Sequence, residues 1–509
     1  MSTVEDVDRL FTMLLSSYSS LLMSGHSYMH NSAEAGVEAA RSSVASSALH
    51  TAVAGLLGQC SALRMQSCMY EGLGEGEAVL QQAQQAQQLD VWAGITPAYL
   101  TSLLPAAVSA VTLSHSRTLE QSCTCVALVS WEEGGAPLPA AMPALPRHLF
   151  LKRASPSLLA RAGGSAQQQH SAASLALHEQ SFRNEQALQR ALAGEGGRHH
   201  AALCAAGAPV PRCLAVAEEQ GVFTSIVEHL EARPQHPSAA YQEVAVCDRA
   251  HAHAVLRWLA AFHAYWWGRP PPPGLHHPGG WWRRACKPEV DFGAIPRVFE
   301  GHCAAFASMG ATLDTPGHRR LMQALPGQCE AMHARAASAQ PNTLLHGDVK
   351  TSNAFFAKAR GKAGSGAAAP PNAPGVPTLF DFQWCGSAGD GLADVAYFVA
   401  GGVAAGEVLQ GGWLELLRVY HQALLQGLAA RGVQLEGLPV AGWEGCRAAF
   451  ERELVVYYTL AAPYLLDGLT PGAMEGNRRK YGWLTHEMEE PMLWWLTSTV
   501  LEALGKGVA

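Results

Sequence analysis

Residues 343–356, TLLHGDVKTSNAFF, constrain the fold of this chain more than any other stretch. Two apolar runs enclose a loop that is almost entirely polar, and a further apolar run, TLFDF at 378–382, follows downstream. The runs NAFFA and TLFDF predict two short strands that pair as a hairpin. Because hairpin strands lie side by side, Asn353 and Asp381 are expected at neighbouring ends of the hairpin, with their oxygens close together.

The residue types in this loop favour phosphoryl chemistry. Carboxylate and amide oxygens suit Mg²⁺, which keeps several waters and takes its other ligands from substrate phosphates. Asp348 is then left to accept a proton from a substrate hydroxyl. Phosphoryl transfer needs such an arrangement, since its catalysis is mostly positioning and charge neutralisation. The triplet HGD alone is also typical of a polar turn, so the prediction depends on the whole combination.

The stretches LLHGDVKTSN, LFDFQW and GDGLADVAYF resemble the aminoglycoside phosphotransferase and choline kinase-like superfamily. The likeness is greatest to its CHK, or ecdysteroid kinase-like, branch, in which LAAFHAYWWG also has a counterpart, and it runs from about Ile95 to about Val500. The resemblance implies an α+β, bilobal protein-kinase-like fold. Its small β-rich first lobe carries one key helix, its larger second lobe is mainly helical, and ATP binds between them.

This resemblance assigns roles in the loop. Asp348 is expected to be the catalytic base, and Asn353 and Asp381 are expected to hold Mg²⁺. Lys350 has the position from which the lysine of D-x-K-x-x-N kinases reaches the γ-phosphate, although small-molecule kinases often have another residue there. A lysine at this point would offset charge that develops on the transferred group.

Other residues near the loop are expected to support it. By the same resemblance, His346 stabilises the loop rather than reacting, and Asp394 braces the loop from a following helix. His263 is interpreted as a hydrogen-bonded core histidine. The tandem histidines at 199–200 and 276–277 have no partners at metal-ligand spacing and are interpreted as exposed.

The first lobe of such a fold supplies a lysine for the ATP phosphates and a helix glutamate that orients it. Lys152 ends an apolar run in HLFLKRAS, and Glu185 matches the F-x-x-E helix of the family, with Glu179 as the alternative. The stretch SIVEHLE is then the hinge, where backbone groups bond the adenine at Glu228, His229 and Leu230.

The loop expected to cover the phosphates departs from the family pattern. It falls near SRTLEQSCTC, where no glycine lies between Ser116 and Cys125. Since glycine lets backbone amides approach phosphates closely, Ser122 is expected to contribute its amide or hydroxyl instead. This departure favours a rival hypothesis, a catalytically weak pseudokinase or nucleotide-binding regulatory module. The complete set Asp348, Asn353 and Asp381 favours an enzyme.

Composition divides the chain into an Ala/Ser/Gln-rich N-terminal extension at 1–90, a first lobe at 91–231 and a helical lobe at 232–509. In the first lobe, a short helix at ITPAYLTSLL, a longer one at 177–192 and strands at 123–131, 147–153, 208–217 and 221–230 are predicted. In the second, helices are predicted at 252–268 and near 314–337, 391–432, 441–463 and 478–505. The low-complexity stretch at 357–377 predicts an insertion at the hairpin tip.

Composition also excludes some classes of function. A chain of 509 residues with 48% hydrophobic residues can bury a large core. Its net charge of -7 gives no polycationic surface for nucleic acid. No apolar run reaches the length of a membrane span, and the acidic N-terminus argues against a targeting signal, so a cytoplasmic location is the default. The twelve cysteines show no zinc spacing, and Cys123 and Cys125 are interpreted as apolar packing.

The sequence therefore predicts an ATP- and Mg²⁺-dependent phosphotransferase that acts on a hydroxyl of a small organic molecule. Choline, amino sugars, steroid alcohols and hydroxyacyl groups all remain open as acceptors, and the oligomeric state is not predicted. Aromatic residues near the C-terminus could cage a quaternary amine, but most are interpreted as helix core: Tyr457, Tyr458, Tyr464, Trp483, Trp494 and Trp495.

Overall fold

The structure is a computed structural model that describes residues 91–92, 94–118, 122–132, 145–155, 172–230, 241–242, 244–275, 279–338, 343–357, 375–387, 389–475 and 489–507. The predicted extension at 1–90 and most of the predicted insertion at 357–377 lie outside these residues. The chain divides into two compact units: 1–95 with 116–123 and 157–171, and the remainder. The second unit holds the helices from Pro97 onward and the 343–356 stretch.

The first half of the chain builds a five-stranded sheet in the order β1-β2-β3-β5-β4, in which β5 runs antiparallel to both β3 and β4. The strands are β1 (Val108–Thr118), β2 (Cys123–Trp131), β3 (His148–Ala154), β4 (Cys213–Glu219) and β5 (Val222–Glu228). The last four confirm the predicted strands. Strand β1 was not predicted, because its buried Val108 is followed by exposed positions and its alternation is weak.

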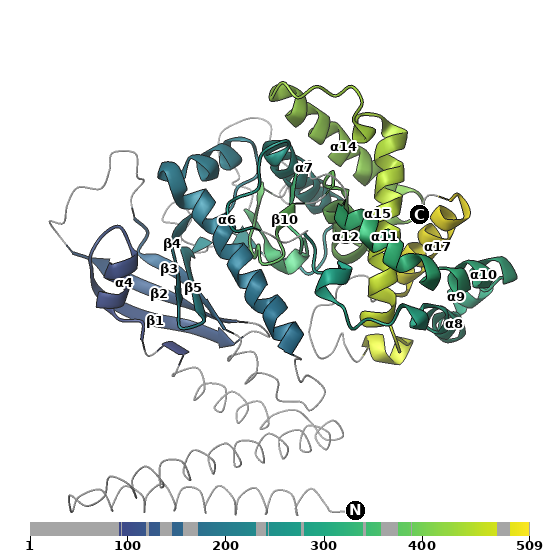
Figure 1. The fold of residues 1–509 in the computed structure, drawn as a ribbon, viewed down its shortest axis with the longest axis horizontal. Coiled ribbons are helices and arrows are strands. Elements are labelled where there is room, and N and C mark those ends of the chain that lie inside the picture. The colour runs from purple at the N-terminus through teal and green to yellow at the C-terminus, as the bar shows by residue number, and fades with distance from the viewer. Residues whose placement is uncertain are drawn as a thin grey trace, which may run out of the picture. The chain divides into compact units, whose positions relative to one another are not determined.

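Helix α6 (Ala172–Ala205) packs on this sheet through β4 and β5, as Figure 1 shows. Its apolar residues Phe182, Leu188 and Leu192 are buried, in agreement with the predicted amphipathic helix. The helix is longer at both ends than the predicted 177–192. Side-chain bonds also join it to the sheet, since the Gln186 amide donates to the carbonyl oxygen of Ala217 at 2.8 Å. The short helix α4 (Pro97–Leu103) confirms the helix predicted before the strands.

The second half of the chain is mainly helical. It comprises α7 (Arg249–Trp266), α8 (Ile295–Ala305), α9 (Ala307–Thr312), α10 (Pro316–Ala324), α11 (Pro326–Ser338), α12 (Leu392–Gly402), α13 (Ala405–Val408), α14 (Gly412–Ala430), α15 (Trp443–Tyr464) and α17 (Glu490–Gly505). Helices α7, α15 and α17 agree with prediction, while residues 478–488 of the predicted 478–505 helix lie outside the described residues. Helices α8 and α9 were not predicted.

Two predicted helices are divided in the structure. The stretch 314–337 forms α10 and α11, because Pro326 lacks the N–H that would continue the hydrogen-bond ladder. The stretch 391–432 forms α12, α13 and α14, and α14 begins after Gly411, whose φ of +84° interrupts the helix.

Short strands lie among these helices. Strand β8 (Ala354–Ala357) pairs antiparallel with β6 (Tyr241–Gln242) and β9 (Pro377–Leu379), and β7 (Leu344–Leu345) pairs antiparallel with β10 (Gly386–Ser387). The predicted hairpin is therefore present. The prediction that Asp381 lies within its second strand is wrong, because β9 ends at Leu379.

The structure confirms the α+β class, with a sheet and its helix first and mostly helices afterwards (Figure 1). Helix α7 is central to the helical part: it packs along α14 and carries the fully buried, stacked rings of Trp258 and Phe262. None of the helices among the described residues combines the length and apolarity that crossing a bilayer requires.

Candidate active site

The loop at 346–353 leaves β7 through a turn that only glycine permits. Gly347 has a φ of +83°, and a Cβ placed there would collide with the backbone carbonyl of Trp384. The close approach is fixed by neighbouring backbone bonds: the Trp281 amide donates to the Gly347 carbonyl at 3.2 Å, and the Gly280 amide donates to the Trp384 carbonyl at 3.0 Å. The loop backbone is therefore held against two other segments before any side chain acts.

The Asp348 side chain receives hydrogen bonds on both carboxylate oxygens. The Asn353 amide nitrogen donates to Oδ2 at 3.1 Å, and Lys350 Nζ lies 3.0 Å from the same oxygen. The Tyr397 hydroxyl donates to Oδ1 at 3.0 Å. Asp348 and Asn353 are buried, while the Lys350 side chain is 36% exposed. The carboxylate thus has a fixed orientation, with its most exposed partner on Oδ2.

Lys152, Glu185 and Asp381 form what we call the lysine–carboxylate cluster. Lys152 Nζ, on β3, lies 2.8 Å from Glu185 Oε2 on α6 and 2.7 Å from Asp381 Oδ1. The structure brings together the lysine and glutamate that the sequence selected. The alternative glutamate, Glu179, instead pairs with Arg183 at 2.5 Å, one helical turn away.

Burial and charge act in opposite directions on the cluster. Desolvation alone lowers the pKa of Lys152, but the charges and hydrogen bonds of Asp381 and Glu185 outweigh it and raise that pKa above the ordinary value. Desolvation raises the pKa of Asp381, and the charge of Lys152 reverses this, so the net shift is downward. Desolvation also raises the pKa of Glu185, and there Lys152 offsets only part of it. Asp381 is therefore held in its charged form.

The backbone of Asp381 adopts an uncommon conformation, with a φ of +65°. Aspartate is one of the few non-glycine residues that enter this left-handed region with some frequency. Such conformations cost of order 1–3 kcal/mol and persist where the surroundings impose them. In this turn the next residue, Phe382, is buried against the His346 ring at a centroid distance of 4.6 Å. The turn points the Asp381 carboxylate at Lys152, and the side chain remains 30% exposed.

Asp394 is the centre of a second group of side chains, which we call the buried network: Asp394, His263, Tyr420 and His346. Asp394 is fully buried in the first turn of α12 and accepts hydrogen bonds from the backbone amides of His346 at 2.6 Å and Gly347 at 2.9 Å. Its Oδ2 also lies 3.1 Å from His263 Nε2, and His263 Nδ1 lies 2.9 Å from the Tyr420 hydroxyl. One carboxylate thus fixes the loop backbone, and His263 is the predicted hydrogen-bonded core histidine.

His346 joins the loop to the segment that carries Asp381. Its Nε2 lies 3.0 Å from the carbonyl oxygen of Phe380, which can only accept, so Nε2 carries the proton. Its Nδ1 then accepts from the amide of Asp348 at 3.3 Å. Desolvation lowers the pKa of this fully buried imidazole despite the carboxylates nearby. Both ring nitrogens are engaged and the ring is neutral, which suits a supporting position.

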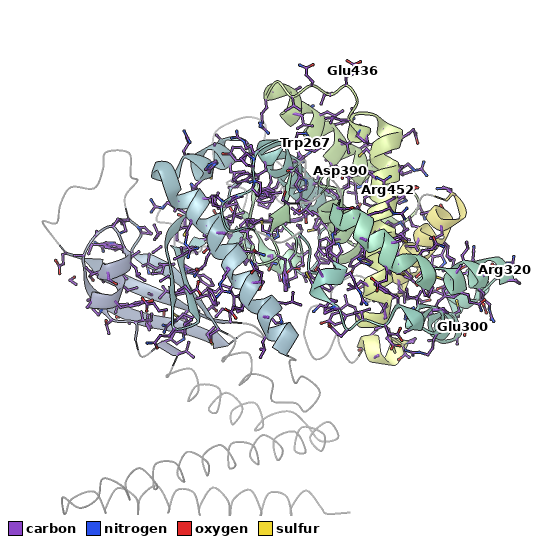
Figure 2. The ribbon with its side chains drawn as sticks, viewed as in Figure 1. Trp267, Glu300, Arg320, Asp390, Glu436 and Arg452 are labelled. Carbon is purple, nitrogen blue, oxygen red and sulfur yellow. The ribbon has the colours of Figure 1, made fainter. Side chains whose placement is uncertain are left out.

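Asp390, labelled in Figure 2, lies just before α12. Its carboxylate accepts a hydrogen bond from the amide of Leu392 at 3.2 Å, which ties it to the start of the helix. Desolvation, with Glu453 nearby, raises the pKa of this carboxyl group. Its polar contacts serve the helix that bears Asp394, and none of them reaches Asp348 in the described part of the chain.

The predicted hinge lies at the end of β5. The amide of Glu228 donates to the carbonyl of Arg212 at 2.9 Å, and the amide of His229 lies 3.3 Å from the carbonyl of His148. Those two N–H groups are used within the sheet, and the expected contact of the hinge backbone with adenine stays a prediction. Ser122 is buried directly before β2, and its expected contact with phosphates stays a prediction.

The cysteines, aromatic residues and paired histidines interpreted from the sequence differ in burial. Cys123 and Cys125 are buried, as expected for apolar packing, and Tyr457, Tyr458 and Trp495 lie in the helix core. Tyr464 is 44% exposed, and Trp483 lies outside the described residues. The interpretation of the histidines at 199–200 as merely exposed is wrong: both are half-buried and hydrogen-bonded, to the Tyr265 hydroxyl and the Val210 carbonyl respectively. The histidines at 276–277 lie outside the described residues.

Sequence reasoning missed Tyr397 as a partner of Asp348. It lies three residues after Asp394 on α12, and residues three apart share a helix face. Its position in the apolar run GLADVAYF favours a core interpretation, and the ring is indeed buried. The spacing from Asp394 was the available signal.

The described residues hold no group of three or more His, Cys, Asp and Glu side chains arranged for a metal ion. A magnesium site does not require three such side chains, because Mg²⁺ can take two protein oxygens, here from Asn353 and Asp381, and complete its shell with water and phosphate oxygens. Asp381 offers a charged and partly exposed carboxylate, and Asn353 offers an amide oxygen. These residues fit a magnesium ion of that kind.

Comparisons with known proteins give structural neighbours alone. No protein-family model matches the chain, and no curated protein matches it in sequence. One similar solved structure is spectinomycin phosphotransferase in complex with ADP and spectinomycin, with 11% identity, a TM-score of 0.33, and coverage of 80% of this chain and 97% of the other. Another is a putative fructosamine-3-kinase from Haemophilus somnus 129PT, with 12% identity, a TM-score of 0.27, and coverage of 78% and 92%.

Proposed function

We propose that this protein is an ATP- and Mg²⁺-dependent phosphotransferase that transfers the γ-phosphate of ATP to a hydroxyl group of a small organic molecule. The observation that carries the proposal is the position of Lys152 Nζ, 2.8 Å from Glu185 and 2.7 Å from Asp381. Three segments far apart in sequence supply these groups, and His346 joins the Asp381 segment to the Asp348 loop. A phosphoryl-transfer site needs a cation for the phosphates, metal-binding oxygens and a base, and these residues provide all three.

Asp348 is the proposed base. Its carboxylate is buried and oriented from both sides, so it can accept the proton of a bound hydroxyl as the oxygen attacks phosphorus. The amide nitrogen of Asn353 donates to Asp348. The amide oxygen of Asn353 is therefore the atom proposed to bind the cation. Mg²⁺ bound by that oxygen and Asp381 supplies charge neutralisation at the phosphates.

Lys152 is proposed to exchange partners when nucleotide binds. In this structure it bridges Glu185 and Asp381, two carboxylates that a single ammonium neutralises only in part. With nucleotide bound, Lys152 would keep Glu185 and direct its remaining N–H groups to the phosphates, and Asp381 would hold the divalent cation. Glu185 is 7% exposed and fixed on α6, so it holds the lysine in place during that exchange.

Lys350 is proposed as the second phosphate contact. Its side chain is 36% exposed and ends 3.0 Å from Asp348 Oδ2. An exposed lysine changes partners at little cost, since surface ion pairs contribute about 0–1 kcal/mol. It can therefore turn from Asp348 to the γ-phosphate and leave the base free for the acceptor.

The test compares three purified Asp→Asn variants with the wild type. Asp348→Asn is expected to bind ATP with Mg²⁺ in a thermal-shift assay and to lose about 100-fold or more of the turnover in a screen of alcohol-bearing metabolites. Asp381→Asn is expected to lose the Mg²⁺-dependent part of the thermal shift. Asp467→Asn, which removes one partner of a surface pair with Arg297, is the matched control and should behave as the wild type.

Wild-type turnover in Asp348→Asn contradicts the proposed mechanism. The rival function, a catalytically weak pseudokinase or nucleotide-binding regulatory module, predicts a different outcome for the wild type: a thermal shift with ATP and Mg²⁺ but no transfer to any alcohol. The glycine-free stretch between Ser116 and Cys125 is the observation that favours it.

A further inference from the structure

The hydroxyl of Tyr397 reaches Asp348 from outside the 346–353 loop. It donates to Oδ1 at 3.0 Å, whereas Asn353 and Lys350 both approach Oδ2. Tyr397 lies on α12, one turn beyond Asp394, which holds the loop backbone. A single helix face thus contacts the loop at two points, its backbone and its carboxylate.

The Tyr397 ring is fixed by other aromatic rings. It stacks on Trp282 with centroids 4.5 Å apart and an interplanar angle of 25°. Tyr457 and Trp281 meet it edge-on at 5.5 and 5.8 Å. A ring packed on three sides keeps one rotamer, so its hydroxyl stays where the carboxylate needs a donor.

We infer that Tyr397 is a positioning residue for Asp348, an inference that rests on the proposed function. Its O–H stabilises the ionised carboxylate and prevents its rotation, because rotation would break the bond to Oδ1. The lone pairs of Oδ2 then face the acceptor once Lys350 has turned to the γ-phosphate. The acceptor proton passes to Oδ2 as the new O–P bond forms and the bond between the γ-phosphorus and the β–γ bridging oxygen breaks, which releases ADP.

The charged and titratable groups around this carboxylate define what a change at Tyr397 can alter. They come from the loop itself, from the segment after β9 and from α12: His346, Lys350, Asp381, Asp394 and Tyr397. Replacing the phenol by phenyl removes one donor to the carboxylate and leaves the other four groups in place.

Tyr397→Phe tests the inference, because it removes the hydroxyl and keeps the stacked ring. We expect kcat to fall about 10-fold, with the KM values for ATP and the acceptor within about two-fold of wild type, since a hydrogen bond to a charged group is stronger than a neutral one. A merely structural role would lower thermal stability and leave the kcat of the folded variant at the wild-type value.

Tyr458→Phe is the matched control: Tyr458 is also a fully buried tyrosine, on α15, and burial rather than any group of the loop raises the pKa of its hydroxyl. It should keep the wild-type kcat and KM values. An active wild type whose Tyr397→Phe variant has the same kcat overturns the inference and leaves the proposed function intact. A wild type that transfers phosphate to no acceptor overturns the proposed function, and the inference with it.

Discussion

Two carboxylates close to the 346–353 loop, Asp394 and Asp381, have opposite environments. Asp394 is fully buried and accepts from two backbone amides. Asp381 is 30% exposed, has a strained backbone and faces a lysine side chain. Backbone donors cannot leave, whereas an ammonium on a flexible side chain can. The type of partner, together with burial, therefore separates a carboxylate that maintains the fold from one that can take up a ligand.

The same division extends to the neighbours of each carboxylate. In the buried network, His263 and Tyr420 complete a chain of hydrogen bonds with no exposed member. In the lysine–carboxylate cluster, one cation serves two anions, which leaves an excess of negative charge for a further cation. Substitutions in the two regions should therefore change the free energy of unfolding by different amounts. Four measurements test this.

The largest effect is expected for Asp394→Asn. Both oxygens of Asp394 accept from backbone amides, so either orientation of the new amide places an NH₂ against an N–H donor. We expect the free energy of unfolding in urea to fall by about 4 kcal/mol, as when a buried charge partner is removed. Asp467→Asn, at an exposed pair with Arg297, should cost less than about 1 kcal/mol. A loss at Asp394 no greater than this control would contradict a structural role for the buried network.

The second-largest effect is expected for Gly347→Ala, which should lower the free energy of unfolding by about 3 kcal/mol. The new Cβ meets the backbone carbonyl of Trp384 as well as requiring a positive φ. Gly389→Ala separates these two causes, because Gly389 has a φ of +63° but no neighbouring atom within 4 Å of the added Cβ. It should cost about 1 kcal/mol, and equal losses in the two variants would show that the collision is relieved elsewhere.

His346 gives the buried network a pH dependence. Its folded-state pKa lies below the ordinary value near 6.5, so below that pH the unfolded chain takes up a proton that the folded protein does not. Its contribution to stability is complete above pH 6.5 and is lost as the pH falls, by about 1 kcal/mol per pH unit. The unfolding free energy of His346→Gln, measured at about pH 7.5, 6.5 and 5.5, should fall less steeply than that of wild type. Parallel slopes would mean that the ring is not neutral in the folded state.

The smallest effect on stability is expected for Asp381→Asn, which mirrors the first substitution. Lys152 keeps its contact with Glu185, asparagine also tolerates a positive φ, and the partly exposed site screens the lost attraction. We expect a change of less than about 1 kcal/mol in the free energy of unfolding. A loss as large as that at Asp394 would mean that Asp381 also maintains the fold.

The sequence alone was sufficient to select Lys152, Glu185 and Asp381. Each lies in a short stretch whose order along the chain and strand or helix context could be recognised, and the structure brings the three together. The strands β2 to β5 were equally readable, because their apolar residues are contiguous. In contrast, β1 alternates weakly and α9 has only six residues, whereas the helical spacing of the buried residues of α8 was an available signal that the prediction missed.

Other features of the site depend on contacts between distant segments. The collision that requires glycine at 347 comes from Trp384, and the donor on Asp348 comes from a tyrosine in an apolar helix. The pairing of Lys350 with Asp348 could not be predicted either, because a lysine two residues after Asp348 can contact either that carboxylate or a phosphate. Asp381 has a left-handed backbone and lies just beyond β9, which ends at Leu379. The strand predicted from the sequence extended to residue 382, so this turn was not predicted.

The burial of helix α12 also affects the order in which parts of the protein unfold. All of its eleven residues are buried, and beyond its C-terminal end the Cys247 amide donates to the Gly402 carbonyl while the Ala404 amide donates to Cys247. A helix with no solvent-facing side exchanges its amide hydrogens only when the surrounding core unfolds. The contacts from Asp394 and Tyr397 to the loop therefore belong to the slowest-exchanging part of the molecule. Peripheral segments can fluctuate or accumulate substitutions while the loop stays in register.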